Sequence, residues 1–259
     1  MNTTLVRFHT KDKIRLDGLL FEPESTTEKI VIHVHGTADY FYRQRFCDDI
    51  AKELTSKGYA FLTFDNRGAH EEYEFITEND KNERQGTVVI GARNEIFEDC
   101  IFDIESAINF VKSRGYKEIV LQGHRYGCNK IVLYAIEKQF KGRLVLLAPC
   151  DMFELAKDPA RNPQGALCKR RSDEKFDIFR YKSESVLPAI SKLKNQILVE
   201  IGTDDDAIYQ TDKQQCIDYL KKAFKGSELT CHLLKDVGHC YQGKYQELAT
   251  NIANWLGEK

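Results

Sequence analysis

The sequence predicts an α/β protein with a mainly parallel, twisted sheet of about eight strands, an antiparallel start, and helices on both faces. Short runs rich in Val, Ile and Leu, with little polar alternation, are typical of strands buried on both faces. These runs alternate along the chain with stretches of helical period. The 259 residues, of which 42% are hydrophobic and 30% charged, are enough for a domain with a sizeable core.

The chain opens with two alternating segments, "TLVRFHT" and "IRLDGLLFEP", which predict an antiparallel start. Buried strands are expected after it at 29–36, 58–68, 117–124, 142–149, 195–205 and 228–239. Helices are expected at 42–58, 94–115, 128–142, 211–226 and 245–259. Several of these helices end at a glycine, which is a common stop signal.

Two long connections interrupt this alternation. Residues 150–194 contain no strand-like run and are far longer than an ordinary connection, so we expect a small lid inserted between core segments 1–149 and 195–259. Lys and Arg outnumber acids about two to one within 156–182, which suits a solvated helix face at least as well as an anionic ligand. Residues 66–93 are expected to form a second long loop at the pocket wall.

Composition excludes several classes of function. A net charge of -2 leaves no global basic field for nucleic acid or an anionic membrane, so we expect neither as a partner. No window approaches the roughly 18 to 20 apolar residues of a membrane span, and the start lacks an apolar signal, which favours the cytoplasm. The eight cysteines show no paired spacing, and "CH" at 231–232 with "HC" at 239–240 is not a zinc spacing. No disulfide, metal or cofactor is expected.

A catalytic turn is suggested by Gly123-His124-Arg125-Tyr126-Gly127, which lies between a buried strand and an apolar helix. Glycines two before and two after a central residue let the backbone turn tightly and let the helix pack close to the sheet. The segment resembles the nucleophile elbow of the α/β-hydrolase superfamily, and the likeness in order and spacing covers nearly the whole chain. In that superfamily the central residue is a serine, whereas here it is Arg125.

The resemblance also implies an oxyanion hole. In the family, one backbone donor follows the nucleophile and another follows the third strand, which corresponds to Tyr126 and to Thr37 in "HVHGTADY". Gly36 would allow a substrate to approach closely. The small-molecule substrate is therefore expected to bind between these two segments.

The remaining catalytic positions follow from the same resemblance. "GTDD" after a late strand places the family's acid at Asp205, with Asp204 and Asp206 as alternatives, and "DVGHCY" supplies its histidine as His239. Cys128, at the start of the elbow helix, is expected to be a buried structural thiol, and His124 to make a structural hydrogen bond.

Arginine at residue 125 changes the chemistry, because a guanidinium stays protonated and cannot attack a carbonyl. One hypothesis is that His239 and Asp205 act as a general base while Arg125 anchors an anionic group or stabilises an oxyanion. Hydrolysis without an acyl-enzyme, lyase and isomerase chemistry would all fit. The alternative is an inactive relative that binds or regulates, with Arg125 paired to a nearby acid.

Overall fold

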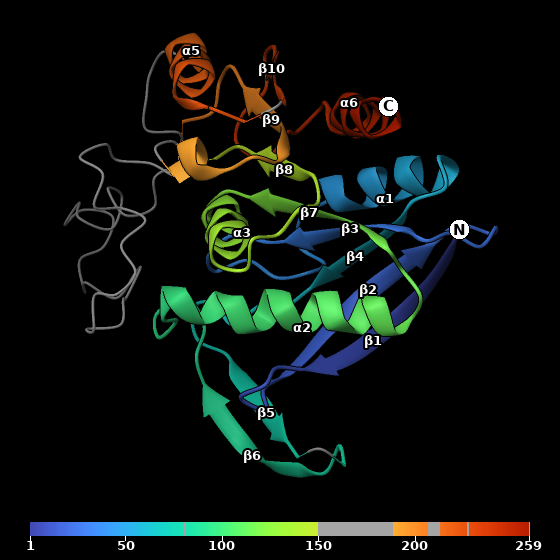
Figure 1. Ribbon diagram of the computed structural model, residues 1–259. Coiled ribbons are helices and arrows are strands. Elements are labelled where there is room, and N and C mark those ends of the chain that lie inside the picture. Colours follow the sequence, from blue (N-terminus) through green and yellow to red (C-terminus); the bar gives the residue numbers. More distant parts are fainter. Residues whose placement is uncertain (80, 150–188, 207–212, 227, 259) are drawn as a thin grey trace.

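The computed structural model describes residues 1–79, 81–149, 189–206, 213–226 and 228–258. Within them, one sheet has the strand order β1-β2-β4-β3-β7-β8-β9-β10 (Figure 1). Its strands are β1 (Asn2–His9), β2 (Arg15–Glu22), β3 (Lys29–Val34), β4 (Ala60–Phe64), β7 (Glu118–His124), β8 (Leu144–Leu147), β9 (Gln196–Gly202) and β10 (Glu228–Leu234). The helices are α1 (Phe46–Ser56), α2 (Cys100–Ser113), α3 (Tyr126–Glu137), α5 (Lys213–Ala223) and α6 (Tyr245–Gly257).

The strand directions match the sequence prediction. β1 and β2 form an antiparallel hairpin, β2 also pairs antiparallel with β4, and the pairs from β4 to β10 are parallel. In the centre of the sheet, Ile32 of β3 lies between Leu62 and Leu121, and all three side chains are fully buried. Burial on both faces explains why these strands are apolar at nearly every position.

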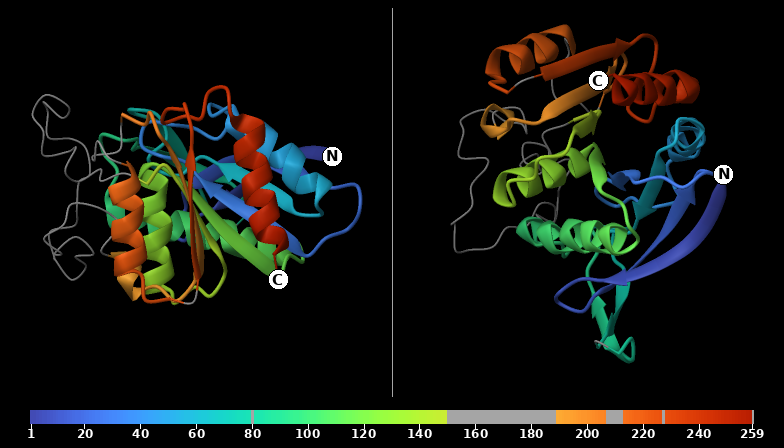
Figure 2. Two further views of the ribbon diagram at one scale, coloured as in Figure 1. Left: turned by 90° about the horizontal axis from the view of Figure 1, so that it is seen from above. Right: turned by 45° about the vertical axis from the view of Figure 1, so that its right-hand side comes forward.

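Helices cover both faces of the sheet (Figure 2). On β3, Ile30 and Ile32 pack into a core shared with α2, α3 and α5, whereas Val31 points to a core shared with α1 and α6. This alternation follows from the period of two in a strand. The helices cover the faces of the sheet, so the loops at the carboxyl ends of the parallel strands form the region where open α/β sheets place their ligand sites.

The prediction of a long loop at 66–93 is wrong in one respect. This segment contains a hairpin of β5 (Glu74–Glu78) and β6 (Arg84–Val89), which stands away from the main sheet (Figure 1). β6 is exposed or half-exposed along its length, so it lacks the apolar run that marks a buried strand. The helix predicted from residue 94 also starts later, at Cys100, after a short 3-10 turn at Phe97–Asp99.

Most of the predicted lid, 150–188, lies outside the described residues, so the lid and its basic character stay a prediction. From 189 onward the chain forms a 3-10 turn, Ala189–Lys192, with Ile190 fully buried. None of the helices in the described parts of the chain is long and apolar enough to cross a membrane. The cytoplasmic location stays a prediction.

Candidate active site

The turn between β7 and α3 is sharp, because Arg125 alone separates the strand from the helix. Its backbone has φ 54° and ψ -120°, a conformation that non-glycine residues rarely adopt. A Cβ at Gly123 would lie 2.5 Å from the carbonyl carbon of Gly127, and a Cβ at Gly127 would overlap the carbonyl oxygen of Val34. Both glycines are therefore needed for this turn to fit against the sheet. The Arg125 amide donates to the carbonyl of Leu147 at 2.9 Å.

The Arg125 guanidinium has no carboxylate partner among the described residues, although the side chain is half-buried. Its Nε is buried and lacks a hydrogen-bond acceptor among the same residues. Asp39 is a nearby acid: burial raises the pKa of Asp39, and the charges of Arg43 and Arg125 oppose that rise. The site thus has a cation that is not neutralised by a salt bridge within the described chain.

His239 and Asp205 form the pair that the sequence predicted. His239 Nδ1 lies 3.0 Å from each carboxylate oxygen of Asp205, whose side chain is fully buried. Asp204 and Asp206 are exposed, and Asp204 accepts a hydrogen bond from the Thr203 hydroxyl instead. Asp205 is therefore the acid of the three that meets the imidazole.

The other ring nitrogen of His239 is the more important one for chemistry. His239 Nε2 is buried and has no hydrogen-bond partner among the described residues. With its proton on Nδ1, toward the carboxylate, the ring keeps a free lone pair on Nε2, which is the arrangement a general base requires.

His124 holds His239 next to the elbow. The two rings are 5.0 Å apart, and His124 Nε2 is 3.1 Å from the His239 carbonyl oxygen. Burial lowers the pKa of His124 to about 3, so the ring is neutral at physiological pH and Nε2–H donates to that carbonyl. His124 thus makes the structural hydrogen bond expected from the sequence.

The loop after β3 lies against the elbow, as expected for Gly36 and Thr37. A Cβ on Gly36 would be 3.2 Å from Arg125 Cβ, so the two backbones are close. The amide of Thr37 takes part in none of the backbone hydrogen bonds among the described residues. Tyr126 is the first residue of α3, where helical amides lack an acceptor within the helix, and its side chain is buried.

The Cys128 thiol lies where the sequence predicted it. Cys128 is fully buried, and its thiol donates toward the carbonyls of Gly123 and Leu147, as expected for a structural thiol. Across the described residues, no three His, Cys, Asp or Glu side chains gather closely enough to hold a metal ion.

Solved structures provide a comparison. The Pyrococcus furiosus esterase PF2001 aligns with 99% of this chain and 91% of its own at a TM-score of 0.69 and 16% identity. Est1E from Butyrivibrio proteoclasticus, whose structure contains ferulic acid, aligns with 97% of this chain and 98% of its own at 0.69 and 17% identity. The esterase domain of a Rhodothermus marinus protein aligns with 98% of each chain at 0.67 and 17% identity. No protein-family model and no curated protein sequence matches.

This chain has the α/β-hydrolase fold. The sheet order with its antiparallel start agrees with the fold expected from the sequence. At identities of 16 to 17%, the likeness to these esterases establishes the fold alone, so the chemistry has to be argued from the residues themselves.

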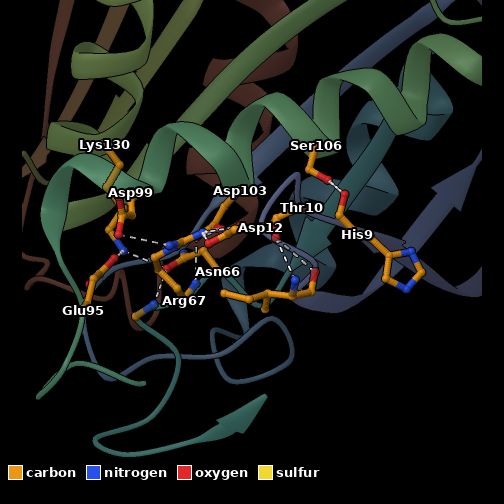
Figure 3. Close-up of polar contacts among 12 residues, drawn as sticks. His9, Thr10, Asp12, Asn66, Arg67, Glu95, Asp99, Asp103, Ser106 and Lys130 are labelled. Atoms are coloured by element: carbon orange, nitrogen blue, oxygen red, sulfur yellow. Dashed lines mark hydrogen bonds and ion pairs between the residues drawn. The ribbon is translucent and has the colours of Figure 1, made fainter. Parts of the chain in front are cut away.

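Within this α/β-hydrolase fold, the sequence did not reveal a buried polar network between α2, α3 and the loop after β4 (Figure 3). Arg67 forms ion pairs with Asp99 and Asp103, and Lys130 forms one with Glu95. The only signal in the sequence was the presence of charged residues inside apolar helical stretches, such as the lysine in "CNKIVLYAIE". Such a residue is compatible with a solvent-facing position, and only the fold brings its partner close.

Proposed function

We propose that the protein is a hydrolase of small esters that carry a carboxylate, and that it works without an acyl-enzyme. His239, held by Asp205, removes a proton from water, and the water oxygen attacks the ester carbonyl. The amides of Thr37 and Tyr126 stabilise the oxyanion that forms. Arg125 binds the carboxylate that the substrate carries.

The proton balance of this reaction closes on His239. The imidazole accepts one proton from water, and Asp205 stabilises the imidazolium that results. When the tetrahedral intermediate collapses, His239 returns the proton to the leaving oxygen, which departs as an alcohol or phenol. The acid is released, and every protein side chain ends as it began.

One observation carries the proposal: His239 has one nitrogen fixed by a buried carboxylate and the other buried without a partner among the described residues. His33 and His124 also each leave one buried ring nitrogen without a partner among the described residues, so the unpaired Nε2 of His239 supports a base only together with the buried carboxylate that fixes its Nδ1. The position of Arg125 on the strained elbow supports an anion beside it, since a half-buried guanidinium without a salt bridge favours an anionic ligand.

A pair of esters tests this proposal. 4-Acetoxybenzoate and its methyl ester differ in the carboxylate charge and in one added methyl group, and release of the phenol can be followed by absorbance. We expect turnover of the carboxylate form, abolished by His239→Ala. Arg125→Met should lower kcat/KM for the carboxylate by roughly ten- to a hundredfold, as expected for loss of a hydrogen bond to a charged group of about 1.5 to 3 kcal/mol. It should change kcat/KM for the methyl ester little.

Hydrolysis of the two esters by wild-type protein and by the variants tests the proposed chemistry. If wild-type protein hydrolyses neither ester, or if His239→Ala leaves the rate unchanged, the proposed chemistry is wrong. If Arg125→Met affects both esters equally, the role given to the guanidinium is wrong.

A second candidate is a non-catalytic binding protein on the same fold, and the absence of a nucleophile at residue 125 favours it. Arg125→Ser separates the two. Under the binding hypothesis, wild-type protein binds 4-acetoxybenzoate in calorimetry without turnover, and the serine variant acquires hydrolysis of the neutral methyl ester. Under the hydrolase hypothesis, wild-type protein already turns over the carboxylate form.

A further inference from the structure

Lys130 is a fully buried lysine on α3, five residues after Arg125. Its ammonium forms an ion pair with Glu95, which is 3% exposed, and donates to Asn66 Oδ1 at 2.7 Å (Figure 3). A buried ion pair of this kind is a weak source of stability, because desolvation of both charges offsets much of their attraction. Fixing the conformation of a neighbouring segment is a better-supported reason for such a pair.

The segment that Lys130 fixes begins with Asn66. An ammonium can only donate, so it sets which end of the Asn66 amide is oxygen and which is nitrogen. The nitrogen Nδ2 then donates to the His35 carbonyl at 3.2 Å, and the Asn66 backbone amide donates to His35 Nε2 at 3.1 Å. Burial lowers the pKa of His35 to about 3, so this ring is neutral and can accept at Nε2.

A second connection runs through Gly68. Its amide donates to Asn66 Oδ1 at 3.0 Å, and its carbonyl accepts from the Ala38 amide at 3.0 Å. A Cβ at Gly68 would lie 2.8 Å from Lys130 Nζ, so the ion pair packs directly against this backbone. Hydrogen bonds from the segment 66–68 therefore fix both His35 and Ala38, the residues that flank Gly36 and Thr37.

We propose that Lys130 is a positioning residue for the oxyanion hole. Through Asn66 and Gly68 it holds the loop from His35 to Ala38, so that the Thr37 amide stays free beside the elbow. Its effect on turnover rests on the proposed function, whereas its effect on the loop does not.

The first test replaces the ion pair without leaving an unpaired charge, by Lys130→Met combined with Glu95→Gln. With 4-acetoxybenzoate as substrate, we expect kcat to fall roughly ten- to a hundredfold, because losing an oxyanion donor outright costs on the order of a hundred- to a thousandfold. KM should stay within about threefold, since Arg125 still binds the carboxylate. An unchanged kcat in the folded double variant would overturn the proposal.

A matched control uses the other lysine ion pair of this helix. Lys138 follows α3 and pairs with Glu105 at 2.7 Å, and both side chains are about a third exposed. Lys138→Met combined with Glu105→Gln removes the same chemical groups and should leave kcat and KM unchanged. An equal loss of kcat in this control would show that the effect is not specific to the buried pair.

A second variant covers the case in which the buried double variant does not fold. Asn66→Asp is isosteric and keeps the acceptor for Lys130 and for the Gly68 amide, but it replaces the donor to the His35 carbonyl by a carboxylate oxygen that repels it. We expect a comparable fall in kcat. Full activity in folded Asn66→Asp would contradict the link between Asn66 and the loop.

An NMR readout distinguishes failure of this inference from failure of the proposed function. In wild-type protein, titration with benzoate should shift the Thr37 amide resonance, and Asn66→Asp should lose more than half of that shift. If wild-type protein has no turnover but the Thr37 response depends on Asn66, the positioning role stands and the hydrolase proposal fails. If turnover occurs and the variants keep both kcat and the Thr37 response, the positioning role fails.

Hydrogen exchange in wild-type protein adds a check that needs no variant. The Ala38 amide, bonded to the Gly68 carbonyl, should exchange much more slowly than the Thr37 amide. The reverse order would contradict the loop geometry on which the proposal depends.

Discussion

Asp65, immediately after β4, is a buried acid whose replacement by asparagine should stabilise the protein in a pH-dependent way. Burial raises the pKa of Asp65 from 3.8 to about 7, with the charges of Asp17 and Asp39 adding to the rise. A hydrogen bond from the Phe41 amide, at 2.9 Å, opposes it. His35 lies 3.8 Å away but is neutral, so it supplies no compensating charge.

The magnitude follows from linkage between proton binding and folding. The folded protein holds the Asp65 proton up to about pH 7, whereas the unfolded chain loses it near 3.8, so stability falls as pH rises between these values. At about 1.4 kcal/mol per pKa unit, the total is about 4 kcal/mol, of which about 2 to 3 kcal/mol falls between pH 5 and pH 8. Asp65→Asn keeps an acceptor for Phe41 and removes the titration.

Urea unfolding at pH 5 and pH 8 measures this effect. The free energy of unfolding of Asp65→Asn relative to wild type should increase by about 2 to 3 kcal/mol from pH 5 to pH 8. The same comparison for Asp206→Asn, an exposed position, should show little change. If the difference between Asp65→Asn and wild type is the same at both pH values, the assignment of a buried, protonated Asp65 is wrong.

Two further substitutions test the packing of the elbow and the buried network. Gly127→Ala places a methyl group on the Val34 carbonyl and should lower the free energy of unfolding by about 3 kcal/mol or more. Gly257→Ala meets open space and should stay within about 0.5 kcal/mol, and similar unfolding midpoints for the two would contradict the close approach. Arg67→Met leaves the buried Asp103 carboxylate with the amide of residue 67 but without a balancing charge from the guanidinium, and should cost about 3 to 5 kcal/mol in thermal or urea unfolding. A loss under 1 kcal/mol would show that this pair is not buried as described.

The sequence was most informative where burial imposes a pattern. β3, β4, β7, β8 and β9 lie in apolar runs, because a strand covered on both faces leaves few positions for polar side chains. The two glycines of the elbow could also be recognised in the sequence. A side chain at Gly123 or Gly127 would overlap the neighbouring backbone, so the turn requires glycine at both positions. Both features are local consequences of the chain itself.

Other features depend on residues that meet only in the folded protein. The sequence placed the acid at Asp205 through the family resemblance, but only the structure shows that Asp205 is buried against His239 while Asp204 and Asp206 are exposed. In the β5–β6 hairpin, β6 is exposed or half-exposed at every position, so its polar sequence suggested a loop. Lys130 looks like a surface residue of an amphipathic helix, and its role becomes visible only beside Asn66, far away in sequence.

The measurement that bears most directly on the central claim is the turnover of 4-acetoxybenzoate by Asp205→Asn compared with Asp204→Asn. If Asp205 holds His239 as the general base, the first variant should lose about a thousandfold or more in kcat, because the asparagine favours the wrong tautomer of the imidazole. Asp204→Asn, which changes an exposed neighbour, should retain nearly full activity. Equal activity of the two variants, or wild-type activity in Asp205→Asn, would contradict the proposed role of the His239–Asp205 pair.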